Sequence, residues 1–320
     1  MSTTTHLTPR AQDLSRFMRA RHNIYLKRVQ GWPAPWTDDP ILQVGRFCNI
    51  FRELDTVTKW IDENIRKPYA DHPHLWFMLC IARYINWPPT LAKLVGTEAW
   101  PDREDFSPEY MTACLEHIAS TGEKVYTGAY MIRAESDPSK PWYSWTKHRY
   151  IAEIVLGRLW EDRELWAIRL EPEPCPGNPA HTLPALECVW NEFQAPRYVG
   201  WGPFMAYEVV TDLRHTRYLR TAPDIDTWAN AGPGAIRGLN RLFGRDLNAQ
   251  PKKAQTNREM FWYMKELNGD PALWPAKWPQ LEMRDIEHSL CEFDKYERVR
   301  LGEGKMRSKY NWRIASNLSK

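Results

Sequence analysis

Two short glycine turns, Gly200-Trp201-Gly202 and Gly232-Pro233-Gly234, each precede an amphipathic segment. Glycine allows a backbone to turn tightly and to approach a ligand, and the helix start that follows presents N–H groups that can bind an anion. Ordinary helix connections would show the same residues. The turns are therefore predicted either to join helices or to bind nucleic-acid phosphates through Gly200, Trp201, Gly202, Gly232 and Gly234.

The order of hairpin, helix, loop, aspartate and helix between Arg197 and Gly244 resembles that of the helix-hairpin-helix DNA glycosylases. In that superfamily a Gly-x-Gly hairpin holds the DNA backbone beside an extruded nucleotide, and an aspartate faces the reaction centre. Gly200 and Gly202 fall where the hairpin glycines would, and Asp226 falls near the catalytic aspartate. The spacing to Asp226 is longer, and the lyase-type lysine and the iron–sulfur cysteines have no counterpart.

A second group of polar residues lies in the segment Ile41 to Ile65, which is predicted to form one helix. Thr37 or Asp38 is expected to cap it, with Pro40 in its first turn. Surface ion pairs would explain the charged flanks of this helix, and a polar cluster at the mouth of a site, which the rigid Pro-Trp entry at Trp36 suits, would explain them equally well. The apolar face contains Phe47, Phe51, Leu54 and Ile61, one flank contains Arg46, Asn49 and Glu53, and the other contains Arg52 and Asp55.

Acidic residues are concentrated in a helix predicted from Leu281 to Val299. Its buried stripe is expected to contain Ile286, Leu290 and Phe293. Helical periodicity then places Lys295 away from the stripe, where it is predicted to be solvated. The acidic residues near the core edge are Glu287 and Asp294 on one flank, and Asp285 and Glu292 with Tyr296 on the other.

Basic and aromatic residues mark two further segments. The helix predicted from Arg10 to Val29 carries the cations Arg16, Arg19, Arg21, Lys27 and Arg28, which either face solvent or contact phosphates. The segment Gly128 to Trp145 interleaves aromatic and basic residues. This composition suits stacking on unpaired bases, although a loop packed over a core would look the same.

Composition sets broad limits on the protein class. The 320 residues are 43% hydrophobic with a formal charge of +3, so they can bury a sizeable core and permit a nucleic-acid partner without requiring one. Core packing is the default explanation for most of the 17 tryptophans. The six cysteines form no CxxC, which predicts a reduced cytosolic protein without structural metal. The sequence shows no signal peptide and no apolar run of membrane-spanning length.

The helical pattern continues elsewhere with little alternation, so the fold is predicted to be all-α. Further helices are expected from His74 to Thr121, interrupted at two Trp-Pro sites, and at His148–Leu170, Leu183–Gln194 and Thr256–Asn268. The connector from Glu171 to Pro184 is not predicted to be a domain boundary. Residues 1–320 are expected to form a single glycosylase-like helical unit, with an N-terminal helical part at 10–170 and a helix-hairpin-helix part with the C-terminal helix at 183–299.

Several motifs in order resemble one bacteriophage family, the α-glutamyl/putrescinyl-thymine pyrophosphorylases, now called amino acid:DNA transferases. A similar helical domain is attached to 5-hydroxymethyluracil DNA kinases. The resemblance covers most of the chain. The motifs are Arg21-His22-Asn23-Ile24-Tyr25, Pro35 to Leu42, Arg46 to Asp55, the two glycine turns, and Ile286 to Tyr296.

The resemblance implies thymidine hypermodification. A kinase first makes 5-pyrophosphoryloxymethyl-uracil in double-stranded phage DNA, and the transferase displaces pyrophosphate with the amine of a free amino acid. The expected site of action is the infected bacterial cell. The phosphate-cradling loop GxxxxGK[ST] of a kinase is absent, since Gly302-Glu303-Gly304-Lys305 fails its spacing. The standalone transferase is therefore favoured, and ATP, pyridoxal phosphate, a nicotinamide or a resident metal is not expected.

The implied chemistry assigns roles to the candidate residues. A carboxylate must accept the proton of the ammonium nucleophile. Asp226 is the first choice, and Glu287, Glu292 and Asp294 are the other catalytic candidates. Cations must bind the pyrophosphate, and Arg237, Arg46 and Arg52 are candidates. The remaining substrate-binding candidates are Asn49, Glu53 and Trp36, and the remaining DNA-binding candidate is Arg28.

Two alternatives stay open at this stage. A glycosylase acting on modified bases would produce abasic sites. A non-catalytic helical module would bind DNA and leave its base composition unchanged.

Overall fold

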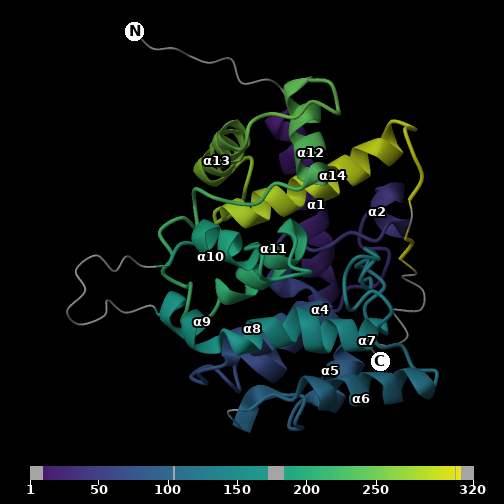
Figure 1. Cartoon of the computed structure of the whole chain (residues 1–320). Helices are drawn as coiled ribbons and strands as arrows, with labels where there is room; N and C mark the ends of the chain where they lie inside the picture. The colour runs from purple at the N-terminus through teal and green to yellow at the C-terminus, as the bar shows by residue number, and fades with distance from the viewer. Residues whose placement is uncertain (1–9, 104, 172–183, 307, 311–320) are drawn as a thin grey trace. The chain divides into compact units, whose positions relative to one another are not determined.

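The structure is a computed structural model that describes residues 10–103, 105–171, 184–306 and 308–310. Every regular element within these ranges is a helix, and extended pairing among them is limited to an isolated bridge between Gly45 and Lys309. The predicted all-α fold is confirmed (Figure 1). Among the same residues we find no helix with both the length and the apolar composition of a membrane span.

The chain divides into two compact units. We call Met1–Asp55 with Ile225–Lys320 the terminal unit, and Thr56–Asp224 the central unit. The predicted connector at 171–184 falls within the central unit, and its residues 172–183 lie outside the described ranges. The terminal unit is thus assembled from the two ends of the sequence.

The terminal unit is built around the long helix α14 (Met283–Arg300), drawn in yellow in Figure 1. The buried residues of α14 include Ile286, Leu290 and Phe293, as its periodicity predicts. A capping box between Glu282 and Asp285 fixes its first turn. Around it pack α1 (Ala11–Val29), α2 (Pro40–Val44), α12 (Pro233–Phe243) and α13 (Lys253–Gly269).

Two glycines one turn apart allow α12 and α14 to approach closely. A Cβ at Gly238 would overlap the carbonyl oxygen of Leu290 and lie 2.9 Å from its carbonyl carbon. A Cβ at Gly234 would overlap the Sγ atom of Cys291 and lie 3.3 Å from its Cβ. Because residues i and i+4 share one helix face, both glycines serve the same contact. Helix packing therefore gives Gly234 a role that needs no DNA.

The prediction of a single helix from Ile41 to Ile65 is wrong. Helix α2 ends at Val44, and only the 3-10 turn η1 (Arg52–Leu54) follows before α3 (Thr56–Ile61). The predicted cap is also corrected, because the Asp39 carboxylate accepts the N–H groups of Ile41 at 2.8 Å and Leu42 at 3.0 Å. Between residues 45 and 55, hydrogen bonds from side chains take the place of the backbone hydrogen bonds of a helix. Contacts of this segment with α1 and α14 therefore outweigh the helical periodicity of its sequence.

The central unit contains the remaining helices. Helix α4 (Leu75–Ile85) is buried along its whole length and packs against α11 (Pro203–Leu213), which also contacts α10 (Leu186–Phe193). Four of the tryptophans, Trp76, Trp100 and Trp166 here and Trp274 in the terminal unit, are fully buried, as expected for core residues. The other elements are η2 (Asp62–Arg66), α5 (Pro88–Leu94), η3 (Pro101–Arg103), α6 (Pro108–Ser120), α7 (Lys147–Arg149), η4 (Tyr150–Leu156), α8 (Gly157–Glu161) and α9 (Arg163–Arg169).

The close approach of α12 and α14 predicts that Gly238→Ala destabilises the protein. A helical Gly→Ala change ordinarily gains up to about 1 kcal/mol, but overpacking against the Leu290 backbone should cost roughly 1–3 kcal/mol. Gly269→Ala is the matched control, because nothing lies within 4 Å of a Cβ there. Chemical unfolding followed by circular dichroism measures both changes, and a Gly238→Ala protein as stable as the wild type would contradict this packing.

Candidate active site

Arg21 organises the non-helical loop between 45 and 55. Its buried guanidinium donates to the carbonyl oxygen of Phe47 at 3.1 Å and to Oδ1 of Asn49 at 2.9 Å. Asn49 in turn donates its backbone N–H and its Nδ2 to Oδ1 of Asp55, both at 2.9 Å. Arg52 pairs with the other oxygen of Asp55 at 3.2 Å. The loop is therefore fixed by side-chain hydrogen bonds to buried or half-buried partners.

Helix α14 contributes charged residues to the same loop. One carboxylate oxygen of Glu292 accepts the backbone N–H of Cys48 at 3.1 Å and pairs with Lys295 at 2.7 Å. Lys295 also donates to the carbonyl oxygen of Arg46 at 2.8 Å, so the predicted solvated lysine is paired with the loop and stays partly exposed. Arg284 lies 3.6 Å from Glu53. Loop and helix together form one polar cluster.

We call this set the loop–α14 cluster. Its four cations face three carboxylates, an excess that suits an anionic group. Part of the side chains of Arg52 and Lys295 remains exposed, so an anion can reach them. The cluster comprises Arg21, Cys48, Asn49, Arg52, Glu53, Asp55, Arg284, His288, Glu292 and Lys295.

Two neutral groups lie among these charges. Burial, followed by the nearby Arg52 and Arg284, holds the pKa of His288 well below its ordinary value. Burial, followed by Glu292 and Asp55, raises the pKa of the Cys48 thiol to about 12. His288 is therefore a neutral imidazole and Cys48 a thiol near neutral pH.

Asp294 belongs to a different set of contacts. Its two oxygens pair with Arg241 at 2.7 Å and with Arg237 at 3.3 Å, and Arg241 also pairs with Glu303. Asp294 is buried, so two arginines largely enclose it. This geometry favours a structural role for Asp294 and Arg237. The catalytic role predicted for Asp294 and the substrate-binding role predicted for Arg237 stay predictions.

The N-terminus of α12 is occupied by a carboxylate of the same chain. Glu287 accepts the N–H of Gly232, the residue that caps α12, at 3.3 Å. This contact satisfies one of the donors that the sequence suggested for a phosphate. Asp226 lies in the turns that precede α12, where it is exposed.

The hairpin at Gly200–Gly202 belongs to the central unit. Gly200 has a φ of +87°, and a Cβ there would lie 2.7 Å from Cγ2 of Val155. Trp201 is buried and donates its indole N–H to the carbonyl oxygen of Val155 at 3.1 Å, so its ring is a core anchor. Gly202 is exposed at the start of α11, with nothing within 4 Å of an added Cβ. Of the three predicted contacts, Gly202 is the accessible one.

Trp36 and Arg28 lie together at the C-terminal end of α1. The Arg28 guanidinium is 5.3 Å from the Trp36 ring and 5.6 Å from the Tyr310 ring. Lys27 donates to the Trp36 carbonyl oxygen at 3.0 Å. These contacts orient an exposed cation, which is compatible with the predicted phosphate contact at Arg28.

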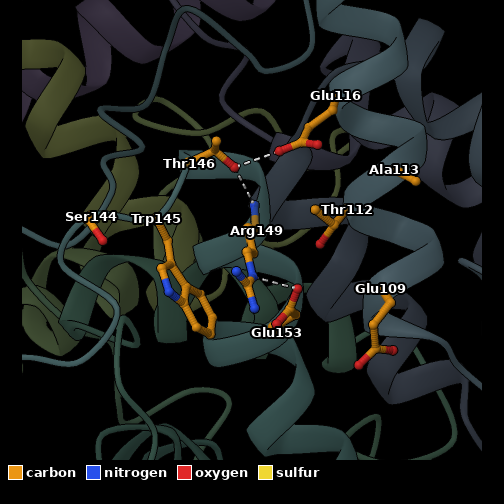
Figure 2. Close-up of a pocket in the computed structure, with 9 residues that line it drawn as sticks. All are labelled: Glu109, Thr112, Ala113, Glu116, Ser144, Trp145, Thr146, Arg149 and Glu153. Atoms are coloured by element: carbon orange, nitrogen blue, oxygen red, sulfur yellow. Dashed lines mark hydrogen bonds and ion pairs between the residues drawn. The ribbon is translucent and has the colours of Figure 1, made fainter.

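A surface pocket in the central unit includes the end of the aromatic and basic segment (Figure 2). Arg149 lies 3.8 Å from the Trp145 ring and pairs with Glu153 at 3.0 Å. Glu109 and Glu116 also line the pocket, whose volume is about 650 Å³. With three carboxylates around one arginine, this surface does not have the charge of a phosphate-binding site.

The predicted residues Asn49, Arg52, Glu53 and Glu292 thus meet in one cluster, to which Arg46 adds its backbone. Sequence reasoning assigned no role to Arg21, Cys48 or His288. A signal was present, because all three lie within the motif segments that carry the family resemblance.

Comparison with known proteins identifies the family. The model of the family described as 5-hmdU DNA kinase, helical domain, matches residues 8–306. The chain belongs to this family. A 5-hmdU DNA kinase from Bacillus phage SP10 is 28% identical over 292 residues, which cover 86% of this chain and 43% of the relative. The chain therefore spans less than half the length of that relative. No solved structure matches the chain.

The contacts of Asp294 predict that Asp294→Asn destabilises the protein. The change weakens both arginine pairs and leaves buried Arg241 undercompensated, which should cost on the order of 3 kcal/mol. Glu303→Gln is the matched control on the same arginine, and only a small loss is expected because Glu303 is partly exposed. Urea unfolding measures both, and an Asp294→Asn protein with wild-type stability would return Asp294 to the catalytic candidates.

Proposed function

We propose that this protein transfers the amine of a free amino acid onto 5-pyrophosphoryloxymethyl-uracil in phage DNA and releases pyrophosphate. Membership of a family named for the helical domain of 5-hmdU DNA kinases supports a role in thymidine hypermodification. The similarity to a phage kinase supports DNA as the substrate. Kinase activity is not proposed for these 320 residues, because the motif GxxxxGK[ST] does not occur in them.

The observation that carries the proposal is the cationic excess of the loop–α14 cluster. Pyrophosphate departs with several negative charges, and preorganised cations stabilise such charge as it develops. Arg52 and Lys295 are partly exposed and already oriented by Asp55 and Glu292. Arg284 adds a further guanidinium, whose planar donors suit phosphate oxygens. We assign the binding of the leaving group to these three cations.

The incoming amine needs a proton acceptor. Glu292 is buried and occupied by Lys295 and the Cys48 N–H, whereas Asp226 is exposed and accessible to a free amino acid. Asp226 is therefore our first choice for the general base, and Glu292 is its rival. The bond that breaks joins the C5 methylene carbon to the pyrophosphate oxygen, and the new bond joins that carbon to nitrogen.

The two glycine turns offer a matched test of DNA binding. Gly202 and Gly232 both cap a helix, both precede proline, and neither has an atom within 4 Å of an added Cβ. Gly202→Val should leave the fold intact and weaken DNA binding at least tenfold by excluding a phosphate, whereas Gly232→Val should bind normally because Glu287 already occupies that N–H. Fluorescence anisotropy with duplex DNA measures both affinities.

Unchanged affinity in a folded Gly202→Val protein would remove the hairpin from the DNA interface. Equal losses in both variants would restore the turn at Gly232 as a second contact.

The reaction is tested by nucleoside mass spectrometry of pyrophosphorylated DNA after incubation with each amino acid in turn. We expect an aminated thymine derivative, pyrophosphate released in step with it, and no requirement for ATP, pyridoxal phosphate or a nicotinamide. Asp226→Asn should bind DNA normally but transfer amine ~10²- to 10⁴-fold more slowly, as loss of a general base typically costs. Higher pH should partly restore its rate, because more of the amino acid is then free amine.

The Glu292→Gln variant is measured in the same assay as Asp226→Asn. Full activity in Asp226→Asn with loss in Glu292→Gln, at unchanged DNA affinity, would move the base to α14. Abasic sites in place of the aminated base would show a glycosylase, and bound DNA of unchanged composition would show a binding module.

A further inference from the structure

Three side chains of the loop–α14 cluster converge on one point. A ligand atom from each of Cys48, Asp55 and His288 lies within 4.8 Å of the other two. Cys48 lies in the loop after α2, Asp55 directly follows η1, and His288 lies in α14. No local sequence pattern brings them together, so only the fold creates this donor set.

The chemistry of the donors is that of a borderline-soft metal ion. A thiolate, a carboxylate and a neutral imidazole are the ligands that Zn²⁺ and similar ions prefer, whereas Mg²⁺ and Ca²⁺ require oxygen. Ligands bound to zinc at about 2.0–2.3 Å lie roughly 3.3–3.8 Å apart in a tetrahedral site. Shifts of about an ångström in these side-chain atoms would bring all three within bonding distance of one ion.

An independent observation points to a missing ligand. The Nε2 atom of His288 is buried and has no hydrogen-bond partner among the residues that the structure describes. A buried polar atom without a partner destabilises the folded protein. Coordination by a metal ion would satisfy a ring nitrogen of this histidine.

The surroundings of the three donors resemble the supporting contacts of metal sites. Asn49 donates two hydrogen bonds to Asp55, Arg52 pairs with its other oxygen, and Glu292 holds the backbone of Cys48. Such contacts orient coordinating groups.

We propose that Cys48, Asp55 and His288 bind a divalent transition-metal ion of the zinc type, with a fourth position left open to water or substrate. Three protein ligands with an open position are typical of catalytic zinc sites. Cysteine spacing alone predicted no structural metal, and it could not reveal this site because His288 lies far from Cys48 and Asp55 in the sequence. The site lies within the loop–α14 cluster to which the transferase proposal assigns the leaving group, and both use Arg52, Asp55 and Glu292. A bound Zn²⁺ with one thiolate would keep the net positive charge of the cluster. Metal binding is tested without DNA, so the two proposals can fail separately.

The test uses the purified full chain and metal alone. After treatment with chelator and dialysis against Zn²⁺ or Co²⁺, elemental analysis should find one equivalent of tightly held metal. The cobalt form should show a thiolate-to-cobalt charge-transfer band. Cys48→Ser should abolish that band and lower metal affinity at least tenfold, and His288→Gln should lower affinity similarly.

Cys291→Ser is the matched control, because Cys291 lies on the same helix as His288 but outside the donor set. It should retain both the metal and the band. A wild-type protein without stoichiometric metal overturns the proposal, as does a charge-transfer band that disappears in Cys291→Ser but persists in Cys48→Ser. Circular dichroism confirms that the variants are folded, and since no DNA is present, failure here leaves the transferase assay unaffected.

Discussion

The buried guanidinium of Arg21 is the interaction on which the candidate site depends. It donates hydrogen bonds to the backbone at Phe47 and to the side chain of Asn49, and Asn49 in turn donates to Asp55. Burial of an arginine is costly, and the loop offsets part of this cost by supplying two oxygen atoms to one Nη of the guanidinium. The conformation that supplies them is not helical, and it presents Cys48, Arg52 and Asp55 to α14.

Helix α14 takes part in two clusters of charged residues that differ in their ratio of cations to carboxylates. Asp294 is neutralised by two arginines, which joins α14 to α12 as the glycine contact at Gly238 does. Other residues of α14, namely His288, Glu292 and Lys295, meet the loop between 45 and 55 in a cluster with a cationic excess. One helix therefore joins a structural ion-pair network to a cluster that can bind an anion.

The glycine hairpin of the central unit is held in place by other contacts. The buried indole of Trp201 and the hydroxyl of Tyr84, which donates to the Gly200 carbonyl oxygen at 3.0 Å, fix the turn from inside. Gly202 is then held at the surface without its own side chain. A rigid turn with an accessible backbone is what close approach to a phosphate requires, since little conformational entropy is lost on binding.

The sequence by itself determined the features that depend on local order. Helical spacing predicted the all-α fold and the buried stripe of Ile286, Leu290 and Phe293, because these follow from 3.6 residues per turn. It placed Asn49, Arg52, Glu53 and Glu292 among the candidates through their positions on the flanks of expected helices, although the first three belong to a loop and a 3-10 turn. Only the tertiary structure decided that residues 45–51 leave the helix, that Lys295 is paired, and that Cys48, Asp55 and His288 converge. The reason is that these outcomes rest on contacts such as that of Cys48 with Glu292, 244 residues apart, which no local periodicity encodes.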